Sequence, residues 1–314
     1  MIALIIILAV LVLLLVGLVV GGYIGYIRTF YNKGTTSTTK IYKGSDPARV
    51  KHEQDLACLM KENATFPFEE IYITAHDKVK LYARYYHIKD GAPVFILMHG
   101  YKSTADRDMS GFFKIARDSS YNILLVDQRG CGKSQNADLT FGIKERYDAL
   151  SWVNYINERF DCPPVFLCGV SLGGSSVLMA SELDLPKNVM GIMSDCAFSS
   201  PTDIIKKVCR DNKYPPLIYP FIKLGAVLFG HFSIGGKGAF LAVKSACVPI
   251  LIIHGKGDNF VPYSMAEKIY ENISSEKTLF PIDSPVHAGC YTENPQGYRD
   301  AVRSFVEKCL LNAK

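Results

Sequence analysis

Residues 165–180 of this chain read VFLCGVSLGGSSVLMA, a short apolar run, a serine between glycines and a helix-like stretch. Apolar runs of this length are typical of a buried strand. Gly169 and Gly173 permit a turn so sharp that larger side chains would clash, which lifts the Ser171 hydroxyl clear of the sheet. The turn also directs the free N–H groups of the next helix at the reacting group. The stretch predicts a strand, a turn with a reactive serine, and a helix; an ordinary glycine-rich turn is the alternative.

The pattern of short apolar runs continues on both sides of this unit. Residues 69–75 and 79–88 predict a β-hairpin, and helical stretches are clearest at 143–160 and 175–183. Further buried strands are predicted at 93–98, 123–126, 189–194, 250–253 and 278–282. Strands that alternate with helices indicate an α/β fold, with a mostly parallel central sheet and helices on both faces. Reactive groups in such folds lie beyond the carboxyl ends of the strands.

The G-x-S-x-G motif of residues 169–173, set between a strand and a helix, resembles the nucleophile turn of the α/β-hydrolase superfamily. The resemblance covers about residues 69–310. It is to membrane-anchored, bacterial-type serine hydrolases, either esterases and lipases or serine aminopeptidases. It implies Ser171 as the nucleophile, followed along the chain by an acid and a histidine. A serine hydroxyl needs such a base, because it is a poor nucleophile near neutral pH.

The acid is implied by residues 254–262, HGKGDNFVP, which are similar to the family's H-G-x-x-D-x-x-V-P segment. In that segment the aspartate, here Asp258, is the acid of the triad, and the histidine, here His254, is structural. Two other carboxylates stay open as alternatives. Asp195 follows a predicted strand, and Asp283 comes shortly before the histidine described next.

The base is implied by residues 286–291, VHAGCY, which are similar to the family's H-A-x-S-Y stretch. His287 is then the base. Cys290 stands where serine is more usual, a departure that does not touch the histidine itself. A plain surface-loop histidine is the alternative interpretation.

Residues 98–101, MHGY, resemble the family's H-G-x motif after the first central strand. This implies an oxyanion hole made by the backbone N–H groups of Tyr101 and Leu172, with His99 as a structural residue. Residues 127–134, DQRGCGKS, match the family's D-x-R-G-x-G-x-S turn, for which we expect a structural role. The spacing of their glycines fits neither a P-loop nor a dinucleotide-binding fingerprint.

A lid insertion is expected over about residues 199–245, between two of the predicted strands. This segment is apolar and punctuated by prolines, and it could form short helices over the site. An apolar lid favours an acyl ester or another hydrophobic ester as substrate. Packing of the core explains the same residues without any ligand.

The N-terminus predicts a membrane anchor. Residues 1–27 carry no charged side chain and are mostly Ile, Leu and Val. Such a helix would be about 40 Å long, enough to cross a hydrocarbon core about 30 Å thick. A cleaved signal peptide is disfavoured because it would have a basic n-region and a shorter apolar stretch. Arg28, Lys33, Lys40 and Lys43 follow, so the positive-inside rule places the catalytic domain in the cytoplasm; an extracytoplasmic domain is the alternative.

Three segments are therefore expected. Residues 1–27 are the transmembrane anchor, residues 28–68 a linker and amphipathic segment, and residues 69–314 the hydrolase domain. The middle segment contains a polar linker at 34–40 and a possible amphipathic helix at 46–61, which could pack on the domain or lie at the membrane surface.

Composition excludes several other classes. Lys and Arg number 35 against 30 Asp and Glu, and this net charge of +5 forms no basic stripe with interleaved aromatics, so nucleic acid is not an expected partner. Nine cysteines, an odd number without a C-x-x-C pair, favour free thiols in a reducing compartment. The implied reaction needs no metal and no cofactor.

The expected function is cleavage of a carboxylic ester, small or lipid-like, through an acyl-enzyme on Ser171. A serine peptidase with the same three residues is an alternative, because peptidases share this fold and triad. A catalytically silent membrane scaffold is an alternative of a different class. The sequence leaves the substrate and the oligomeric state open.

Overall fold

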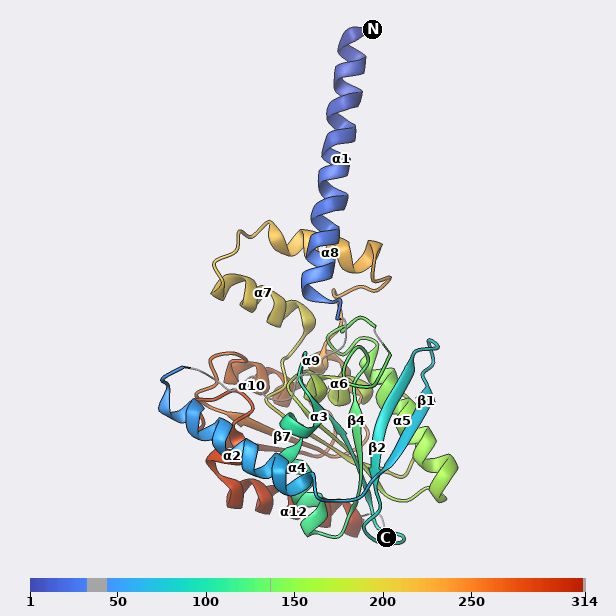
Figure 1. Cartoon of the computed structure of the whole chain (residues 1–314), viewed down its shortest axis with the longest axis vertical. Helices are drawn as coiled ribbons and strands as arrows, with labels where there is room; N and C mark the ends of the chain where they lie inside the picture. Colours follow the sequence, from blue (N-terminus) through green and yellow to red (C-terminus); the bar gives the residue numbers. More distant parts are fainter. Residues whose placement is uncertain (33–43, 136, 313–314) are drawn as a thin grey trace.

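The computed structural model describes residues 1–32, 44–135 and 137–312. In this part of the chain, eight strands form one sheet in the order β1-β2-β4-β3-β5-β6-β7-β8 (Figure 1). The strands are β1 (Glu69–Thr74), β2 (Lys80–Tyr86), β3 (Val94–Met98), β4 (Asn122–Asp127), β5 (Val165–Val170), β6 (Val189–Asp195), β7 (Ile250–Gly255) and β8 (Lys277–Ile282). The predicted linker at 34–40, and the flanking Lys33 and Lys43, lie outside the described residues.

The predicted hairpin and parallel sheet are both confirmed. β1 and β2 pair antiparallel, β2 pairs antiparallel with β4, and all strands from β4 to β8 pair parallel. After β3, the chain first adds β4 on one side and then crosses to add β5 on the other. Loops that leave β3 and β5 therefore diverge at their carboxyl ends, which is where an open α/β sheet forms its ligand crevice.

Helices cover both faces of the sheet. One face packs against α4 (Ser110–Asp118) and α12 (Pro295–Asn312), and the other against α5 (Glu145–Phe160), α6 (Leu172–Ala180) and α10 (Tyr263–Asn272). Alternate side chains of β3 enter the two cores, Phe95 on one face and Ile96 on the other, as the two-residue period of a strand requires. Shorter helices are α3 (Ala105–Asp108) and α11 (Cys290–Glu293).

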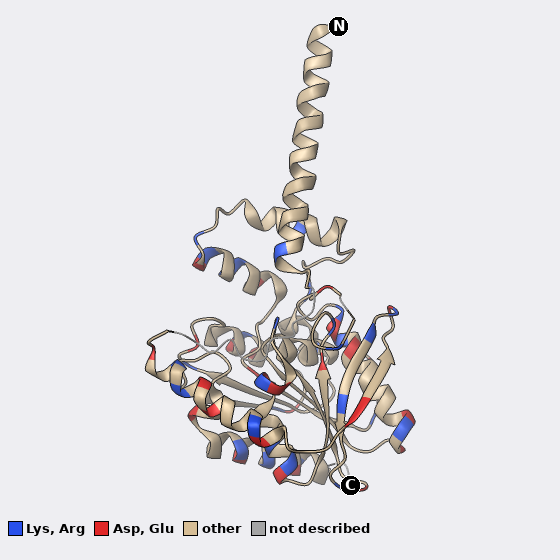
Figure 2. Cartoon of the chain, viewed as in Figure 1, with Lys and Arg blue, Asp and Glu red and all other residues tan. Residues whose placement is uncertain are grey.

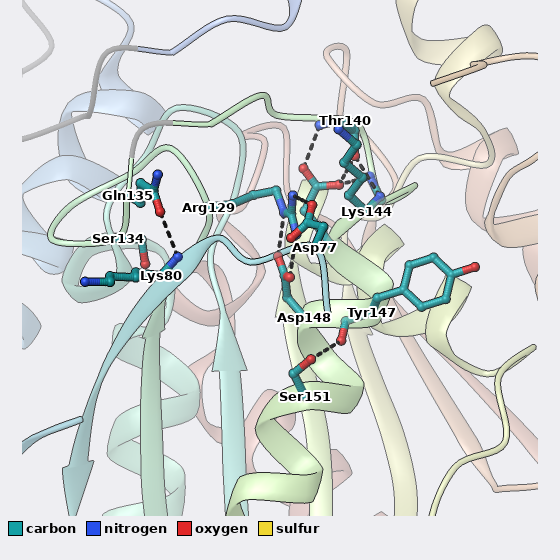
Figure 3. A network of polar contacts seen from close by, with 12 residues as sticks. Asp77, Lys80, Arg129, Ser134, Gln135, Thr140, Lys144, Tyr147, Asp148 and Ser151 are labelled. Carbon is teal, nitrogen blue, oxygen red and sulfur yellow. Dashed lines mark hydrogen bonds and ion pairs between the residues drawn. The ribbon is translucent and has the colours of Figure 1, made fainter. Parts of the chain in front are cut away.

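A buried ionic network holds the turn at residues 127–134 (Figure 3). The Arg129 side chain donates two hydrogen bonds of 2.6 Å to the Asp148 carboxylate on α5 and one of 2.8 Å to Asp77 in the β1–β2 turn. Gly132 has φ +53°, and a Cβ there would lie 1.9 Å from Asp127 Oδ2. These contacts give the turn the structural role expected for it.

The segment between β6 and β7 forms a helical cap. It contains α7 (Pro201–Asp211), α8 (Ile218–Leu228), α9 (Ala239–Ala242) and a 3-10 turn at Val243–Ser245. Figure 1 shows α7 and α8 on the same side of the sheet as the long N-terminal helix α1 (Ile2–Thr29), with α8 crossing α1. A Cβ on Gly225 of α8 would lie 2.1 Å from the Gly22 carbonyl oxygen of α1, so the two backbones touch.

The end of α1 is embedded in the domain. Phe30, the residue after the helix, is fully buried, and its ring packs against Phe141 and Phe232 at centroid distances of 5.8 and 5.0 Å. The Tyr26 hydroxyl donates a hydrogen bond of 2.6 Å to Asp138. Toward the N-terminus α1 projects away from the domain, and Figure 2 shows no charge on it until its last turns. The helix is thus joined to the α/β domain by core contacts.

The predicted amphipathic segment forms α2 (Pro47–Asn63), which packs on the domain. Asp46 caps it by accepting a hydrogen bond from the Ala48 N–H, and Pro47 occupies the first turn, where its missing N–H costs nothing. Glu53 pairs with Arg107 at 2.6 Å, and His52 Nδ1 lies 2.7 Å from Thr292 Oγ1. These contacts place α2 beside the carboxyl ends of the strands.

Candidate active site

Ser171 lies at the apex of the turn between β5 and α6. Its φ of +54° and ψ of −113° are a strained combination for a residue with a side chain. Two hydrogen bonds of 2.9 Å hold it there, one from its own N–H to the Asp195 carbonyl and one from the Ser175 N–H to its carbonyl. A Cβ on Gly173 would lie 1.9 Å from the Met98 carbonyl oxygen, and one on Gly169 would lie 2.2 Å from Gly173. Both glycines are therefore required by close backbone contact.

His287, in the loop after β8, reaches Ser171 from across the sheet edge. Its Nε2 lies 2.9 Å from Ser171 Oγ, and its Nδ1 lies 2.6 Å from Asp258 Oδ2. Since an ionised carboxylate only accepts, Nδ1 carries the proton and Nε2 is the acceptor for the serine hydroxyl. The structure thus brings Ser171, His287 and Asp258 into one hydrogen-bonded chain.

Asp258, in the loop after β7, is buried and fixed by the backbone. Its Oδ1 accepts hydrogen bonds of 2.8 and 2.9 Å from the N–H groups of Phe260 and Val261. Burial alone would raise the pKa of Asp258, but the hydrogen bond and charge of His287 and the Val261 N–H together outweigh burial and hold the pKa of this carboxyl below its usual range. Asp258 therefore faces His287 as a charged, positioned carboxylate.

The two alternative acids do not contact His287 by hydrogen bonds. Asp195 Oδ2 accepts a hydrogen bond of 3.2 Å from the Tyr298 hydroxyl, and burial raises the pKa of Asp195 to about 6. The Asp283 side chain is 88% exposed and lies 3.5 Å from Lys256. Of the three carboxylates weighed, the geometry favours Asp258.

The predicted oxyanion-hole residues flank Ser171. Leu172 is the first residue of α6, so its N–H belongs to the first turn, which has no intrahelical acceptor. On the other side, a Cβ on Gly100 would lie 3.4 Å from Ser171 Cβ, which places the loop after β3 against the serine. Tyr101 follows in that loop, and its side-chain hydroxyl donates a hydrogen bond of 2.7 Å to the Thr29 carbonyl of α1.

Asp108 is a site residue that the sequence reasoning missed. Its Oδ2 accepts a hydrogen bond of 2.8 Å from the Gly100 N–H, and its Oδ1 accepts one of 2.7 Å from the Ser103 hydroxyl. It thereby fixes the loop that carries Tyr101. No spacing rule points to it, because the bond depends on how α3 folds back over the loop.

The two histidines interpreted as structural are fully buried, and neither is hydrogen-bonded to Ser171 or His287 among the contacts of the described residues. His99 Nε2 accepts a hydrogen bond of 3.1 Å from the Gln128 N–H, and its Nδ1 lies 2.8 Å from the Gly100 carbonyl. His254 Nε2 lies 2.8 Å from the Val261 carbonyl. Each ring ties a site loop to a neighbouring segment.

Cys196 lies beside Asp258 and His287, so that a thiol, a carboxylate and an imidazole, three types of metal ligand, are close together. Its sulfur and ligand atoms of Asp258 and His287 lie within 4.8 Å of one another. Burial raises the pKa of the Cys196 thiol well above its usual value, which disfavours the thiolate that metals bind. His287 Nδ1 and Asp258 already bind each other. This donor set fits a hydrogen-bonded pair better than a metal site.

Two cavities meet at Ser171. One, of about 510 Å³, combines charged side chains of α2 and α3, including Arg49, Glu53 and Arg107, with apolar ones such as Leu56 and Val286. The other, of about 560 Å³, is lined mainly by apolar side chains of α1, α7 and α8. Tyr101 and Phe260 line both cavities. The serine hydroxyl therefore lies between a compartment that carries charged side chains and one that is mainly apolar.

Comparison with known proteins matches residues 93–218 to the family described as alpha/beta hydrolase fold. The Bacillus subtilis protein YqkD, described as uncharacterized, is 23% identical over 276 residues, which cover 85% of this chain and 88% of that protein. The zebrafish (Danio rerio) lysophosphatidylserine lipase ABHD12 is 25% identical over 193 residues, 60% of this chain and 49% of the lipase. The chain thus matches about half the length of that lipase.

Among solved structures, the Pyrococcus furiosus esterase Pf2001 superposes with a TM-score of 0.65 at 20% sequence identity. The superposition covers 89% of this chain and 98% of the esterase, so the two share their fold over nearly the whole domain. The order of the strands, the strained serine after β5 and the matched residues all indicate the same fold. The chain thus has the α/β-hydrolase fold, and residues 93–218 match the family of that name.

Proposed function

We propose that this protein is a serine hydrolase that cleaves carboxylic esters through an acyl-enzyme on Ser171. The observation that carries the proposal is the continuous chain from Ser171 Oγ to His287 Nε2, at 2.9 Å, and from His287 Nδ1 to Asp258, at 2.6 Å. Serine, histidine and carboxylate in this geometry activate the hydroxyl for attack on an acyl group.

In the proposed reaction, His287 Nε2 takes the hydroxyl proton while Ser171 Oγ bonds to the ester carbonyl carbon. The N–H groups of Tyr101 and Leu172 hold the resulting oxyanion. As the oxyanion collapses, the C–O bond to the alcohol breaks, and His287 returns its proton to the leaving oxygen. A water then attacks the acyl-enzyme by the same steps and releases the carboxylic acid. Asp258 stabilises the protonated imidazole throughout.

An ester is favoured over a peptide by the polar cavity. A peptidase that binds a substrate amine needs a carboxylate available to it. Among the described residues, three carboxylates line this cavity: Asp46 caps α2 by accepting from the Ala48 N–H, Glu53 is paired with Arg107, and Asp108 accepts from the Gly100 N–H and the Ser103 hydroxyl. Among the similar proteins, ABHD12 is a lipase and Pf2001 is an esterase, which agrees with this choice.

The proposal includes a membrane anchor. Helix α1 is the one described helix long and apolar enough to cross a bilayer. Its basic flank, of which Arg28 is described, favours a catalytic domain on the cytoplasmic side by the positive-inside rule. Free cysteines, several of them exposed, agree with a reducing compartment.

The test uses the full chain in detergent micelles, because Phe30 and the end of α1 belong to the core. Hydrolysis of p-nitrophenyl acyl esters is compared for the parent, Ser171→Ala and Ser151→Ala. The Ser151 hydroxyl donates a hydrogen bond to the Tyr147 carbonyl within α5 (Figure 3). Ser151 takes no part in the proposed reaction and is therefore the matched control. We expect Ser171→Ala to lose nearly all activity and Ser151→Ala to retain it.

A parent with no esterase activity, or a Ser171→Ala variant that keeps it, contradicts the proposal. A parallel panel of aminoacyl p-nitroanilides separates the remaining possibilities. Turnover of the anilides alone indicates a peptidase, and turnover of neither series indicates the non-catalytic scaffold.

A further inference from the structure

We infer that the membrane helix α1 is itself a wall of the acyl-binding site, so that an acyl chain reaches Ser171 sideways from the bilayer, between α1 and the cap. The inference rests on the proposed function and adds its substrate class. That class is a membrane-resident amphiphile whose acyl chain occupies the apolar cavity and whose polar alcohol occupies the other one.

The first support is the path of the apolar cavity. It begins at Ser171 and runs between one face of α1, presented by Gly21, Ile24 and Gly25, and the cap residues Val208 on α7 and Phe221 on α8. Arg28 is the one charged side chain among the described residues that line it. Alkyl chains are stabilised in such surroundings because their apolar surface leaves water. We call this cavity the acyl tunnel.

The second support is the close packing of α1 on the cap. A Cβ on Gly25 would lie 3.0 Å from Ile222 Cα, and one on Gly21 would lie 2.6 Å from the Phe221 ring. With Gly22 against Gly225, these small residues form a backbone-to-backbone crossing of the kind common between helices in membranes. The wall that α1 supplies is therefore held in place by α8.

The third support is where the acyl tunnel opens. Ile24 lines the tunnel, and the same residue is 51% exposed on α1. Leu217, Val227 and Leu228, at the two ends of α8, are also exposed, next to a helix that we propose to be in the bilayer. The charged residues of these two helices are Arg28 and Lys223, which form the blue segments near the crossing in Figure 2, and every other position of both helices is uncharged. The opening beside Ile24 thus faces lipid rather than water.

The fourth support is the contrast between the linings of the two cavities that meet at Ser171. Beyond Ser171, the second cavity is lined by Arg49, Lys102 and Arg107 together with Glu53 and the buried His52. Burial lowers the pKa of His52 to about 4, so it is neutral at pH 7. Such a lining suits a polar, hydrogen-bonding alcohol. An ester placed at Ser171 would be aligned with its apolar part toward the bilayer and its polar part toward water.

The inference predicts how activity depends on chain length. Each methylene that moves from water into the acyl tunnel is expected to raise kcat/KM by about fourfold, until the tunnel is full. A bulky ring placed in the α1 wall should remove this gain. If it excludes two or three methylenes, the preference for a long ester over a short one falls by about fifteenfold to sixtyfold.

The experiment measures the ratio of kcat/KM for p-nitrophenyl decanoate to that for p-nitrophenyl acetate, using the full chain in maltoside micelles. The ratio cancels any general loss of folded enzyme. Ile24→Trp changes the α1 wall and Val208→Trp the α7 wall. Leu13→Trp, on a 71% exposed position of α1 far from the acyl tunnel, is the matched control. We expect a reduced ratio for the first two variants and the parent ratio for Leu13→Trp.

Equal ratios for Ile24→Trp and Leu13→Trp overturn the inference, because α1 is then not a wall. A ratio that is lowered by Val208→Trp alone also overturns the inference, because the acyl chain then contacts the cap and not α1. Calorimetric binding of decanoate to Ser171→Ala, with and without Ile24→Trp, gives a readout that needs no turnover. Loss of binding on adding Ile24→Trp supports the acyl tunnel even if the ester panel refutes the proposed reaction, and unchanged binding contradicts it.

Discussion

Asp258→Asn isolates the role of the negative charge, because the substitution keeps the size of the side chain. In the parent, one carboxylate oxygen accepts a hydrogen bond of 2.6 Å from His287 Nδ1. The other oxygen accepts hydrogen bonds of 2.8 and 2.9 Å from the N–H groups of Phe260 and Val261. All three partners are donors. Asparagine offers an acceptor on one side only and a donor on the other, so it cannot satisfy all of them.

The size of the effect follows from these three bonds. If the amide oxygen faces the two backbone N–H groups, its NH₂ faces Nδ1. The His287 proton must then move to Nε2, which can no longer accept from Ser171. The opposite orientation leaves two N–H groups unpaired at about 1–3 kcal/mol each, so the productive arrangement lies about 2–6 kcal/mol higher. The loss is then about 30-fold to 10⁴-fold, before the loss of charge stabilisation on the imidazolium is added. We expect kcat to fall about 10³-fold or more, and the same substitution in a Ser–His–Asp triad costs about 10⁴-fold.

The assay is kcat for a short-chain p-nitrophenyl ester, measured between pH 6 and pH 9 with the full chain in micelles. Asp283→Asn is the matched control, because this exposed residue precedes His287 by only four positions. Asp195→Asn tests the alternative acid. The reasoning is refuted if Asp258→Asn stays within about tenfold of the parent, or if Asp195→Asn loses more activity than Asp258→Asn.

Two further predictions concern stability. Arg129→Met leaves Asp148 buried without its partner and should lower the free energy of unfolding by about 3–5 kcal/mol, whereas Lys133→Met, which removes an exposed pair with Glu70, should change it little. Urea unfolding of both variants checks this, and equal losses would contradict it. Burial raises the pKa of Asp195 to about 6, above its unfolded value of about 3.9, so the folded state holds an extra proton between these values. Its contribution therefore makes the free energy of unfolding fall as pH rises from about 4 to 6, by at most about 1.4 kcal/mol per pH unit. Asp195→Asn should remove that slope in urea titrations at each pH, and an unchanged slope would exclude this assignment.

Much of the fold was predictable because its signals are local. A run such as residues 93–98 is too short and too apolar for anything but a buried strand, and it forms β3. The position of Ser171 followed in the same way, since Gly169 and Gly173 are needed by contacts within one turn. Helix ends were less certain: the stretch expected at 175–183 begins earlier, at Leu172, because the turn itself supplies the first helical N–H groups.

The arrangement of the site depended on contacts between distant segments, which no local pattern records. Asp195 and Asp258 both follow strands in the sequence, and only their positions in three dimensions show which one reaches His287. The end of α1 could not be placed either, because residues 1–27 are apolar on all sides. Such a run has no period to distinguish lipid-facing from protein-facing residues. The hydrogen bond from the Tyr101 hydroxyl to the Thr29 carbonyl joins residues 72 positions apart, so no local pattern predicts it.

The burial of Phe30 has a consequence for synthesis of the protein. Helix α1 leaves the ribosome well before the aromatic partners of Phe30, which are Phe141 and Phe232. Phe232 is made about 200 residues later, which takes roughly 10–40 s at translation rates of about 5–20 residues per second. During that interval the helix can enter the bilayer while its last turn has no partner. Docking of that turn is therefore among the last steps of folding. With α1 as the proposed anchor, the domain closes around a helix that is already in the membrane.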